Sequence, residues 1–294
     1  MRCTVTSCKT IFSLATLLLT TAPLVMAQGT YTQFDVPGAL GTVGIGIDTV
    51  GNIDGFYFDA NGNTHGFLLS GGTYMTVDYP GGTNTQLLGK NDKGQIVGVA
   101  LPQGASAYSG FVYDVMTQTL STMSRSGATQ TSPFSINNAG LIAGTLYYSS
   151  SQQTVGFELV GSKYVAIKPP GTELVHAAGI SASGVVEVTA YSPTVENFLF
   201  SHGKYQSLSI PDAPGAELVG ISSAGVVGSY EPSSGGTAGF LYQNKILTTL
   251  QFPGSTFAQA WSINDAGEVV GYFADSGDIQ HGFTWEPPAD AAKR

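Results

Sequence analysis

Cysteine is almost absent from this chain: the 294 residues include only two, Cys3 and Cys8, both close to the amino terminus. An apolar stretch follows over residues 11–26, and Val25-Met26-Ala27 fits the small-residue rule for signal-peptide cleavage. We therefore predict a signal peptide over residues 1–27 and a secreted product, extracellular or periplasmic, without any thiol. This excludes cysteine nucleophiles, cysteine–metal sites and a disulfide scaffold. An uncleaved membrane anchor is the alternative interpretation of the same segment.

Charge is also scarce, and positive charge is scarcest. Charged residues make up 11% of the chain, with 11 Lys and Arg against 20 Asp and Glu. Cleavage would remove Arg2 and Lys9, so the formal charge would change from −9 to about −11, with 9 basic residues against 20 acidic ones. An acidic surface repels phosphate backbones, which argues against a nucleic-acid partner. No second long apolar run follows, so we expect no membrane insertion after cleavage.

A sustained helical period is missing too, but a repeat of about 43 residues is present in six copies. Each copy holds a turn that ends in glycine and, further on, a strand that usually reads Gly-Phe. The turn glycines are spaced 43, 46, 44, 41 and 42 residues apart, at Gly51, Gly94, Gly140, Gly184, Gly225 and Gly267. The phenylalanines are spaced 44, 46, 41, 42 and 43 apart, at Phe67, Phe111, Phe157, Phe198, Phe240 and Phe283. Two independent markers therefore give the same period.

Each repeat has the length of one four-stranded propeller blade. The mature chain begins with a lone fourth strand over 31–36 and ends with a lone third strand over 282–285. Pairing of these two strands would complete the last blade and hide two sheet edges. The sequence therefore predicts a six-bladed β-propeller over residues 28–288, closed by its amino-terminal strand, and a short disordered tail over 289–294. An open β-solenoid or a β-sandwich would explain neither the staggered ends nor the six-fold period.

The repeat resembles the HAF-type extracellular repeat of secreted bacterial proteins. The likeness rests on Ile136-Asn137-Asn138-Ala139-Gly140, on Ile263-Asn264-Asp265-Ala266-Gly267 followed by His281-Gly282-Phe283, and on His65-Gly66-Phe67-Leu68-Leu69. It covers nearly the whole mature chain, although glycine replaces the family's central alanine in most copies. The resemblance implies export and a repeat fold, and it brings no activity or site residue with it.

Two loops carry oxygen ligands at alternate positions, which is loosely the pattern of a calcium site. These ligands are Asp59, Asn61 and Asn63 in one loop and Asp275 and Asp278 in the other. Neither loop is followed by a bidentate glutamate at the expected distance, and a hairpin turn favours the same residues. We therefore prefer hairpin turns and expect no cofactor, with calcium as the alternative.

The connections between the second and third strands of each repeat vary in length and composition, over 59–64, 101–109, 147–155, 191–196, 231–238 and 274–280. Variation on a fixed scaffold typically marks the recognition face of a protein. The residues expected to bind a ligand on that face or at the channel mouth are Tyr108, Tyr147, Tyr148, Glu173, His176, Tyr191 and Trp261. The repeated phenylalanines, by contrast, are expected in the core.

Catalytic motifs are lacking: there is no Gly-x-Ser-x-Gly, and the acidic residues form no repeated or clustered pair. The sequence favours a non-catalytic, monomeric binding scaffold whose partner is an extracellular glycan or protein. The alternative is a polysaccharide-acting hydrolase or lyase with its site in the central channel. A purely structural role in the envelope or matrix is the third possibility.

Overall fold

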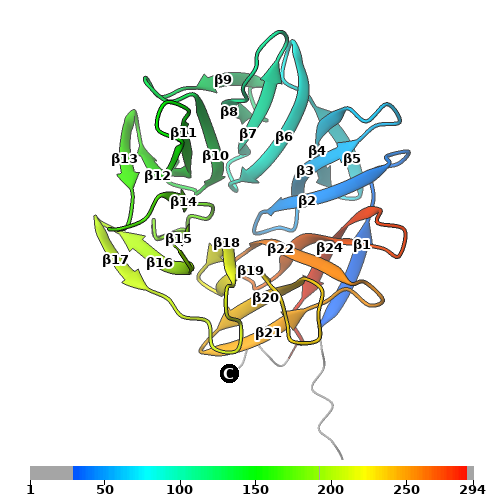
Figure 1. The fold of residues 1–294 in the computed structure, drawn as a ribbon. Coiled ribbons are helices and arrows are strands. Elements are labelled where there is room, and N and C mark those ends of the chain that lie inside the picture. The colour runs from blue at the N-terminus through cyan, green and yellow to red at the C-terminus, as the bar shows by residue number, and fades with distance from the viewer. Residues whose placement is uncertain (1–28, 192, 290–294) are drawn as a thin grey trace, which may run out of the picture.

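The computed structural model describes residues 29–191 and 193–289, and within them every regular element is a β-strand (Figure 1). The predicted signal peptide and residues 290–294 of the predicted tail lie outside the described residues. No described segment forms a helix that could cross a membrane.

The strands follow the sequence repeats, with four strands to each repeat. Repeat 1 holds β2 (Gly41–Ile47), β3 (Ile53–Phe58), β4 (Thr64–Ser70) and β5 (Thr73–Val77). Repeat 2 holds β6 (Gly82–Lys90), β7 (Gln95–Pro102), β8 (Ser109–Asp114) and β9 (Thr119–Met123). Repeat 3 holds β10 (Gln130–Ile136), β11 (Ile142–Tyr148), β12 (Gln153–Val160) and β13 (Lys163–Ile167). Repeat 4 holds β14 (Leu174–His176), β15 (Val186–Tyr191), β16 (Val195–Ser201) and β17 (Lys204–Ser207). Repeat 5 holds β18 (Glu217–Ser222), β19 (Gly225–Tyr230), β20 (Ala238–Gln243) and β21 (Ile246–Leu250). Repeat 6 holds β22 (Phe257–Ile263), β23 (Val269–Ala274), β24 (Gln280–Glu286) and β1 (Thr30–Phe34).

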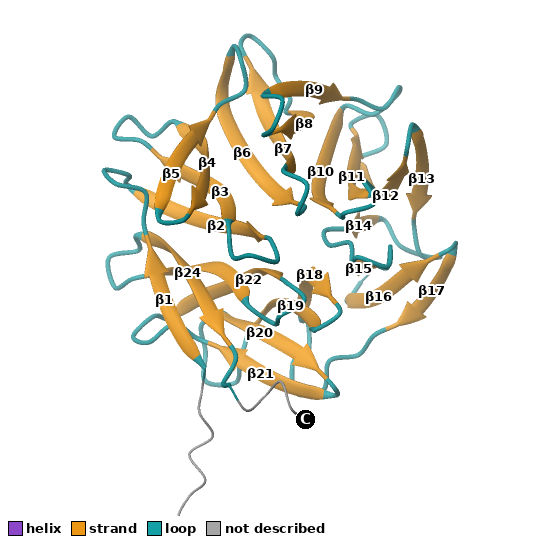
Figure 2. Ribbon diagram, turned by 180° about the vertical axis from the view of Figure 1, so that it is seen from behind, coloured by secondary structure: helices purple, strands orange, loops and turns teal. Residues whose placement is uncertain are grey.

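The four strands of each repeat pair antiparallel in order. Repeats 5 and 6 each form a separate four-stranded sheet. Repeats 1 and 2 share one sheet, and so do repeats 3 and 4, because single parallel bridges join Thr64 to Asn84 and Thr154 to Leu174. Figures 1 and 2 show the repeats side by side around a common centre, with the first strand of each repeat innermost.

The amino-terminal strand β1 lies at the outer edge of the last repeat. It pairs antiparallel with β24, from Thr30 opposite Glu286 to Phe34 opposite Gly282. The staggered ends of the sequence predicted this pairing. It places the first and last described strands in one sheet.

The repeated phenylalanines fill the space between the sheets, as the sequence predicted. Five of them, at positions 67, 111, 157, 240 and 283, have no exposed surface. The glycine before each keeps the packing close: a Cβ on Gly66 would lie 2.6 Å from the Val77 carbonyl oxygen. Repeat 4 departs from this pattern, because Asn197 replaces the glycine and Phe198 is only half-buried.

Repeat 4 also has the shortest inner strand. β14 ends at His176, and the chain then runs to a single bridge between Ile180 and Val186. Its backbone is completed by side chains instead of by a full strand ladder. Glu187 accepts hydrogen bonds from the amides of Ala178 and Gly179, at 3.1 and 2.6 Å.

Candidate functional site

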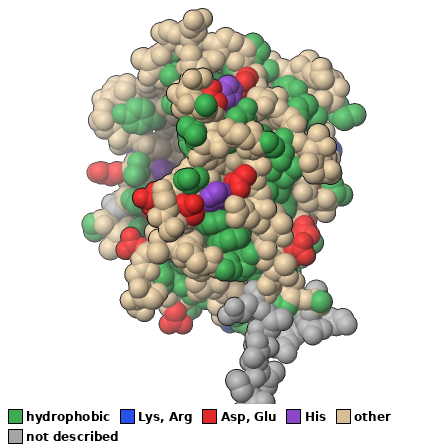
Figure 3. Space-filling view, turned by 90° about the vertical axis from the view of Figure 1, so that its right-hand side faces the viewer, with side chains coloured by type: hydrophobic (Ala, Val, Ile, Leu, Met, Phe, Trp, Pro, Cys, Tyr) green, Lys and Arg blue, Asp and Glu red, His purple; other side chains and the backbone are tan. Residues whose placement is uncertain are grey.

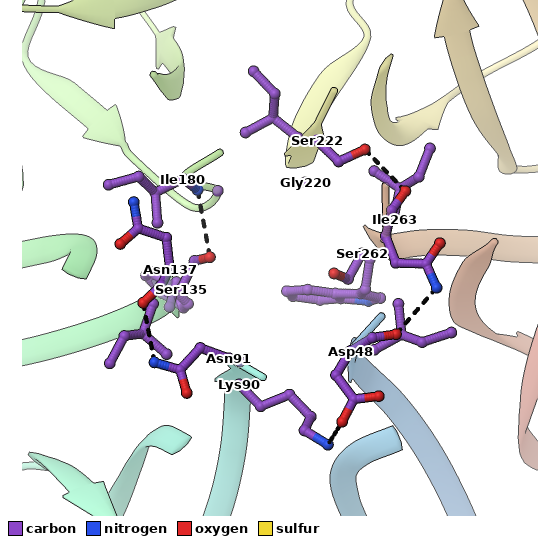
Figure 4. Close-up of a pocket in the computed structure, with 18 of the residues that line it drawn as sticks. Asp48, Lys90, Asn91, Ser135, Asn137, Ile180, Gly220, Ser222, Ser262 and Ile263 are labelled. Atoms are coloured by element: carbon purple, nitrogen blue, oxygen red, sulfur yellow. Dashed lines mark hydrogen bonds and ion pairs between the residues drawn. The ribbon is translucent and has the colours of Figure 1, made fainter. Parts of the chain in front are cut away.

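A cavity of about 110 Å³ lies at one end of the central channel (Figure 4). Its walls are the last residues of the inner strands and the turns that follow them, which we call the inner turns. These turns begin at Asp48, Asn91, Asn137, Ser181, Ser222 and Asn264. The sequence placed the candidate site on the variable loops and at the channel mouth; this cavity lies at the ends of the inner strands that are away from the variable loops.

The inner turns are linked to one another by side-chain hydrogen bonds. The Asn91 amide donates to the Asn137 carbonyl at 3.0 Å, and Asn137 donates to the Ser181 carbonyl at 2.9 Å. Ser222 donates to the Asn264 carbonyl, and Asn264 donates to the Asp48 carbonyl, both at 3.0 Å. The last of these bonds joins repeat 6 to repeat 1, which are at opposite ends of the sequence.

The same asparagines also hold their own turns. The Asn137 side-chain oxygen accepts from the amides of Ala139 and Leu141, both at 3.0 Å. Asn91 and Asn264 make the equivalent bonds. Because both ends of each side chain are engaged, the repeated asparagine is a scaffold residue and offers little to a ligand.

One contact between repeats 1 and 2 breaks this pattern and contains a buried charge pair. Lys90 Nζ lies 2.6 Å from Asp48 Oδ2, and both side chains are almost fully buried. The other five repeats have isoleucine where repeat 2 has Lys90. Burial alone would raise the pKa of Asp48, but Lys90 and Asn52 outweigh it and lower that pKa.

A second carboxyl group, Asp54, lies near this pair on β3. It is completely buried, and neither of its oxygens has a hydrogen-bond partner. It fits only because its neighbour is Gly46, where a Cβ would overlap the Asp54 carboxyl group. Burial raises the pKa of Asp54 to about 7, with the Asp48 charge adding to the rise and the Lys90 charge opposing it.

Repeat 4 carries an acid at the same position of its second strand. Glu187 corresponds to Asp54 in the repeat, where the other four copies have Val97, Ala143, Val227 and Val270. It is completely buried, and its second oxygen has no partner. Burial raises the pKa of Glu187 to about 8, and the two backbone amides that it binds oppose this rise. The carboxyl group is therefore mostly protonated at neutral pH.

The exposed carboxylates of the inner turns are engaged as well. Asp92 accepts from the amide and hydroxyl of Thr49, both at 2.9 Å, and from the Asn138 side chain. Asp265 accepts from the amide and hydroxyl of Ser223, at 3.0 and 2.8 Å. These carboxylates hold neighbouring turns together, and each is committed to that role.

Of the seven residues that the sequence selected, only Trp261 lines the cavity. Its indole nitrogen is buried without a hydrogen-bond partner. Tyr108, from a variable loop, packs against the same hydrophobic cluster, which is centred on Val43, Ile45 and Leu88. The structure thus brings two predicted residues together, but mainly through packing.

Two further predicted residues meet between repeats 4 and 5, at the variable-loop end. The rings of His176 and Tyr191 lie edge to face with centroids 5.6 Å apart. The Tyr191 hydroxyl donates to Glu217 Oε1 at 2.7 Å, a partner that the sequence did not suggest. Burial lowers the pKa of His176 and Glu217 partly offsets this, whereas burial and Glu217 together raise the pKa of Tyr191.

The remaining predicted residues do not join this group. Glu173 is exposed on the connection into β14. Tyr147 donates to Gln152 at 3.1 Å on its own hairpin, and Tyr148 packs against the core between repeats 2 and 3. The structure therefore provides a small cluster of His176, Tyr191 and Glu217 instead of one seven-residue site.

The two loops with a calcium-like pattern form hairpin turns. Asp59 accepts from the Asn63 side chain at 3.0 Å and from the amides of Asn63 and Asn61, both at 2.8 Å, and these bonds lower its pKa. Asp275 accepts from the amides of Gly277 and Ile279 in the same way. Within 29–191 and 193–289, no group of three His, Cys, Asp or Glu side chains could hold a metal. Calcium at these loops, which was the alternative interpretation, stays untested.

Each of these loops also contacts a histidine. His65 lies between Asp78, at 2.9 Å, and Asp59, at 3.5 Å. His281 lies between Asp35, which follows β1, and Asp275, at 2.9 and 3.5 Å. In Figure 3, which faces the right-hand side of Figure 1, histidine side chains lie next to acidic ones. The pairs tie each hairpin to the end of the outermost strand.

No protein-family model matches the sequence, and no curated protein matches it. Among solved structures, a lectin from Aleuria aurantia in complex with Fucα1-6GlcNAc is similar, with a TM-score of 0.54 and 13% identity over 85% of this chain and 93% of that chain. The β-propeller domain of the Trilobed protease from Pyrococcus furiosus is similar with a TM-score of 0.54 and 9% identity over 84% of this chain and 96% of that chain. TolB from Acinetobacter baumannii is similar with a TM-score of 0.54 and 10% identity over 84% of this chain and 64% of that chain. These likenesses, together with the sheet arrangement, show a β-propeller architecture.

Proposed function

We propose that this chain is a secreted, non-catalytic binding scaffold whose ligand is an extracellular glycan or protein held on the variable-loop face. The scaffold would be a monomeric, six-bladed propeller of the HAF-type repeat family, closed by β1. The pairing of β1 with β24 and the hydrogen bond from Asn264 to the Asp48 carbonyl support closure. The pairing covers the edge of β24 that would otherwise be free.

The observation that supports the non-catalytic part is the engagement of amide and carboxylate side chains of the inner turns. The Asn91, Asn137 and Asn264 amides bind neighbouring turns, and the Asp92 and Asp265 carboxylates do the same. A general acid or base must be free to reach the proton that it transfers. Groups committed to the scaffold favour binding over catalysis in the channel.

A glycan ligand is favoured by the cluster of His176, Tyr191 and Glu217 at the variable-loop end. The cluster combines aromatic faces with a carboxylate. The apolar C–H face of a sugar ring can pack on the aromatic faces, and its hydroxyl groups can bind the carboxylate. The lectin among the structural neighbours is consistent with this ligand class.

A glycan array, combined with a hydrolysis screen on the same polysaccharides, tests the proposal. We expect saturable binding of at least one glycan without turnover, and weaker binding by Glu217→Gln and Tyr191→Phe. Tyr113→Phe is the matched control, because Tyr113 packs in the core between repeats 1 and 2. Cleavage of any polysaccharide by the pure protein would replace the scaffold with an enzyme. Binding that the two cluster variants leave unchanged would move the site elsewhere.

A further inference from the structure

The inner strands share a β-bulge at the same position of the repeat. In five of them the pairing with the second strand skips one residue, which is the extra residue of the bulge. Each extra residue lies six residues before the turn glycine of its repeat, and repeat 4 has Ala178 at this position. A bulge changes the direction in which its side chain points. We call the six residues at this position the bulge ring: Ile45, Leu88, Phe134, Ala178, Val219 and Trp261.

The bulge ring lies three residues deeper in the channel than the inner turns, and all six of its residues line the cavity there. The residue after each bulge is glycine or serine, and Figure 4 shows Gly220 and Ser262 of this set beside the cavity. These small residues bring neighbouring repeats together. A Cβ on Gly89 would lie 2.5 Å from the Phe134 carbonyl oxygen, and one on Gly220 would lie 2.6 Å from that of the next repeat. The channel is therefore narrow at the bulge ring, which forms the floor of the cavity.

The accessible part of this floor is apolar and mainly aromatic. Phe134, Val219 and Trp261 are only half-buried, whereas the other three members of the bulge ring are buried. The indole nitrogen of Trp261 is itself buried, so the accessible part of that ring consists of carbon. Figure 1 shows β10 and β22, which carry Phe134 and Trp261, on opposite sides of the channel. The floor thus presents two aromatic side chains from opposite sides.

Charged groups around the cavity leave an excess of negative charge. The lining includes the carboxylates of Asp48, Asp92 and Asp265 and one lysine, Lys90. Lys90 is taken up by Asp48 in the buried pair. The donors to Asp92 and Asp265 are hydroxyl, amide and backbone groups, so these two carboxylates keep their charge. Their attraction for a cation acts across the cavity without direct contact.

We propose that the cavity at the inner turns binds a small organic cation of the quaternary ammonium class, with its methyl groups on Phe134 and Trp261. Aromatic faces attract such a cation and cover its methyl groups. The charges of Asp92 and Asp265 add to this attraction and disfavour anions. At about 30 Å³ for each water-sized group, a cavity of about 110 Å³ holds about four groups, as many as a trimethylammonium head has non-hydrogen atoms. This site is independent of the glycan site proposed above.

Choline is the probe, and 3,3-dimethylbutan-1-ol is its matched control, because this alcohol has the same shape with carbon in place of the charged nitrogen. Isothermal titration of the mature protein should give saturable choline binding with a stoichiometry of one. The alcohol should bind about tenfold more weakly, because it lacks the attraction of the rings and the carboxylates for a cation. Higher ionic strength should weaken the binding of choline and leave that of the alcohol unchanged.

Trp261→Leu and Phe134→Leu keep the floor apolar but remove one ring each, so each should weaken choline by about fivefold and the alcohol by less. Phe58→Leu is the matched control, because Phe58 packs in the same hydrophobic cluster but is not among the residues that line the cavity. Asp265→Asn should weaken choline by about twofold. Asp278→Asn removes the same charge from a variable loop and should leave the affinity unchanged.

Thermal unfolding shows which variants are folded, and the comparison of choline with the alcohol on the natural sequence needs no variant. Equal affinity for choline and the alcohol would overturn the proposal. So would the absence of saturable choline binding, or an effect of Phe58→Leu as large as that of a folded Trp261→Leu or Phe134→Leu variant. A negative glycan array would not affect it.

Discussion

The buried charges between repeats 1 and 2 give the sharpest test of how the repeat scaffold is stabilised. Lys90 pairs with Asp48 at 2.6 Å, and Asp54 lies nearby without a hydrogen-bond partner. Lys90→Ile places the residue of the other five repeats at this position but leaves two buried carboxyl groups without a cation. Breaking a buried pair in this way costs about 3–5 kcal/mol. We expect the free energy of unfolding to fall by that amount at neutral pH.

The triple variant Asp48→Asn, Asp54→Val, Lys90→Ile restores all three positions to the pattern of the other repeats. An asparagine at position 48 could donate to the Asn91 carbonyl, as Asn264 donates to the Asp48 carbonyl. Replacing a buried charge network with well-packed residues is typically neutral or stabilising by about 1–4 kcal/mol. The triple variant should therefore be at least as stable as the natural sequence, although it contains the substitution that is damaging alone.

Urea unfolding followed by tryptophan fluorescence measures both variants, with Lys93→Gln as the control for an exposed lysine in the same turn. Acidification provides an internal check. Protonation of Asp54, whose pKa is raised to about 7, removes its charge, so the penalty of Lys90→Ile should be smaller at pH 5 than at pH 7.5. A triple variant as unstable as Lys90→Ile alone would refute the reasoning, because the defect would then not come from unpaired charge.

Three further predictions concern single positions. Glu187 keeps its proton in the fold up to a pKa of about 8, whereas its usual pKa is 4.5, so unfolding at a pH between these values releases a proton. The free energy of unfolding should therefore fall by up to about 1.4 kcal/mol for each unit by which the pH rises in this range. Glu187→Gln should flatten this slope in urea titrations at several pH values. Burial lowers the pKa of His65, but Asp78 and Asp59 outweigh it and raise that pKa. The stabilisation that results, of less than about 1 kcal/mol, is complete below pH 6.5 and is lost as the pH rises through the raised pKa. Asp78→Asn should remove this loss from thermal melts. Asn137→Ala should destabilise the protein by about 1–3 kcal/mol, because it leaves the Ala139 and Leu141 amides without their acceptor, and an unchanged melting temperature would contradict the scaffold role of the inner turns.

Local sequence was enough to predict the strands, the core phenylalanines and the pairing of the chain's ends. The repeat period and the turn residues can both be read along the chain without knowledge of distant contacts. Phe67 and Phe283 could therefore be assigned to the core from their position in the repeat. The contact between Tyr191 and Glu217 could not be predicted in this way, since it depends on how repeats 4 and 5 face each other. The cavity at the inner turns could not be predicted from the turns themselves, because nearly uniform turns carry no variation that would mark a site.

Some of the missed residues did leave a signal in the sequence. Lys90 stands where five repeats have isoleucine, and Asp54 and Glu187 stand where four repeats have valine or alanine. Comparing the repeats position by position would have selected all three. The comparison would not have shown their environment, because only the fold reveals that Asp54 lies over Gly46 and that Glu187 completes the backbone of a shortened strand.

The junction between repeats 4 and 5 is joined in a different way from the other five. Hydrogen bonds between inner turns join repeats 2 to 3, 3 to 4, 5 to 6 and 6 to 1, and an ion pair joins repeats 1 and 2. Between repeats 4 and 5, the Ser181 hydroxyl binds within its own turn. Away from the inner turns, this junction is joined by hydrogen bonds from Tyr191 to Glu217, from Asn197 to the Ala216 carbonyl and from the Leu218 amide to Thr189. The chain's two ends meet in repeat 6, where β1 adds a full strand ladder. Opening should therefore begin at the inner-turn end between repeats 4 and 5, and hydrogen exchange should be faster in the turn that begins at Ser181 than in the turn that begins at Asn137.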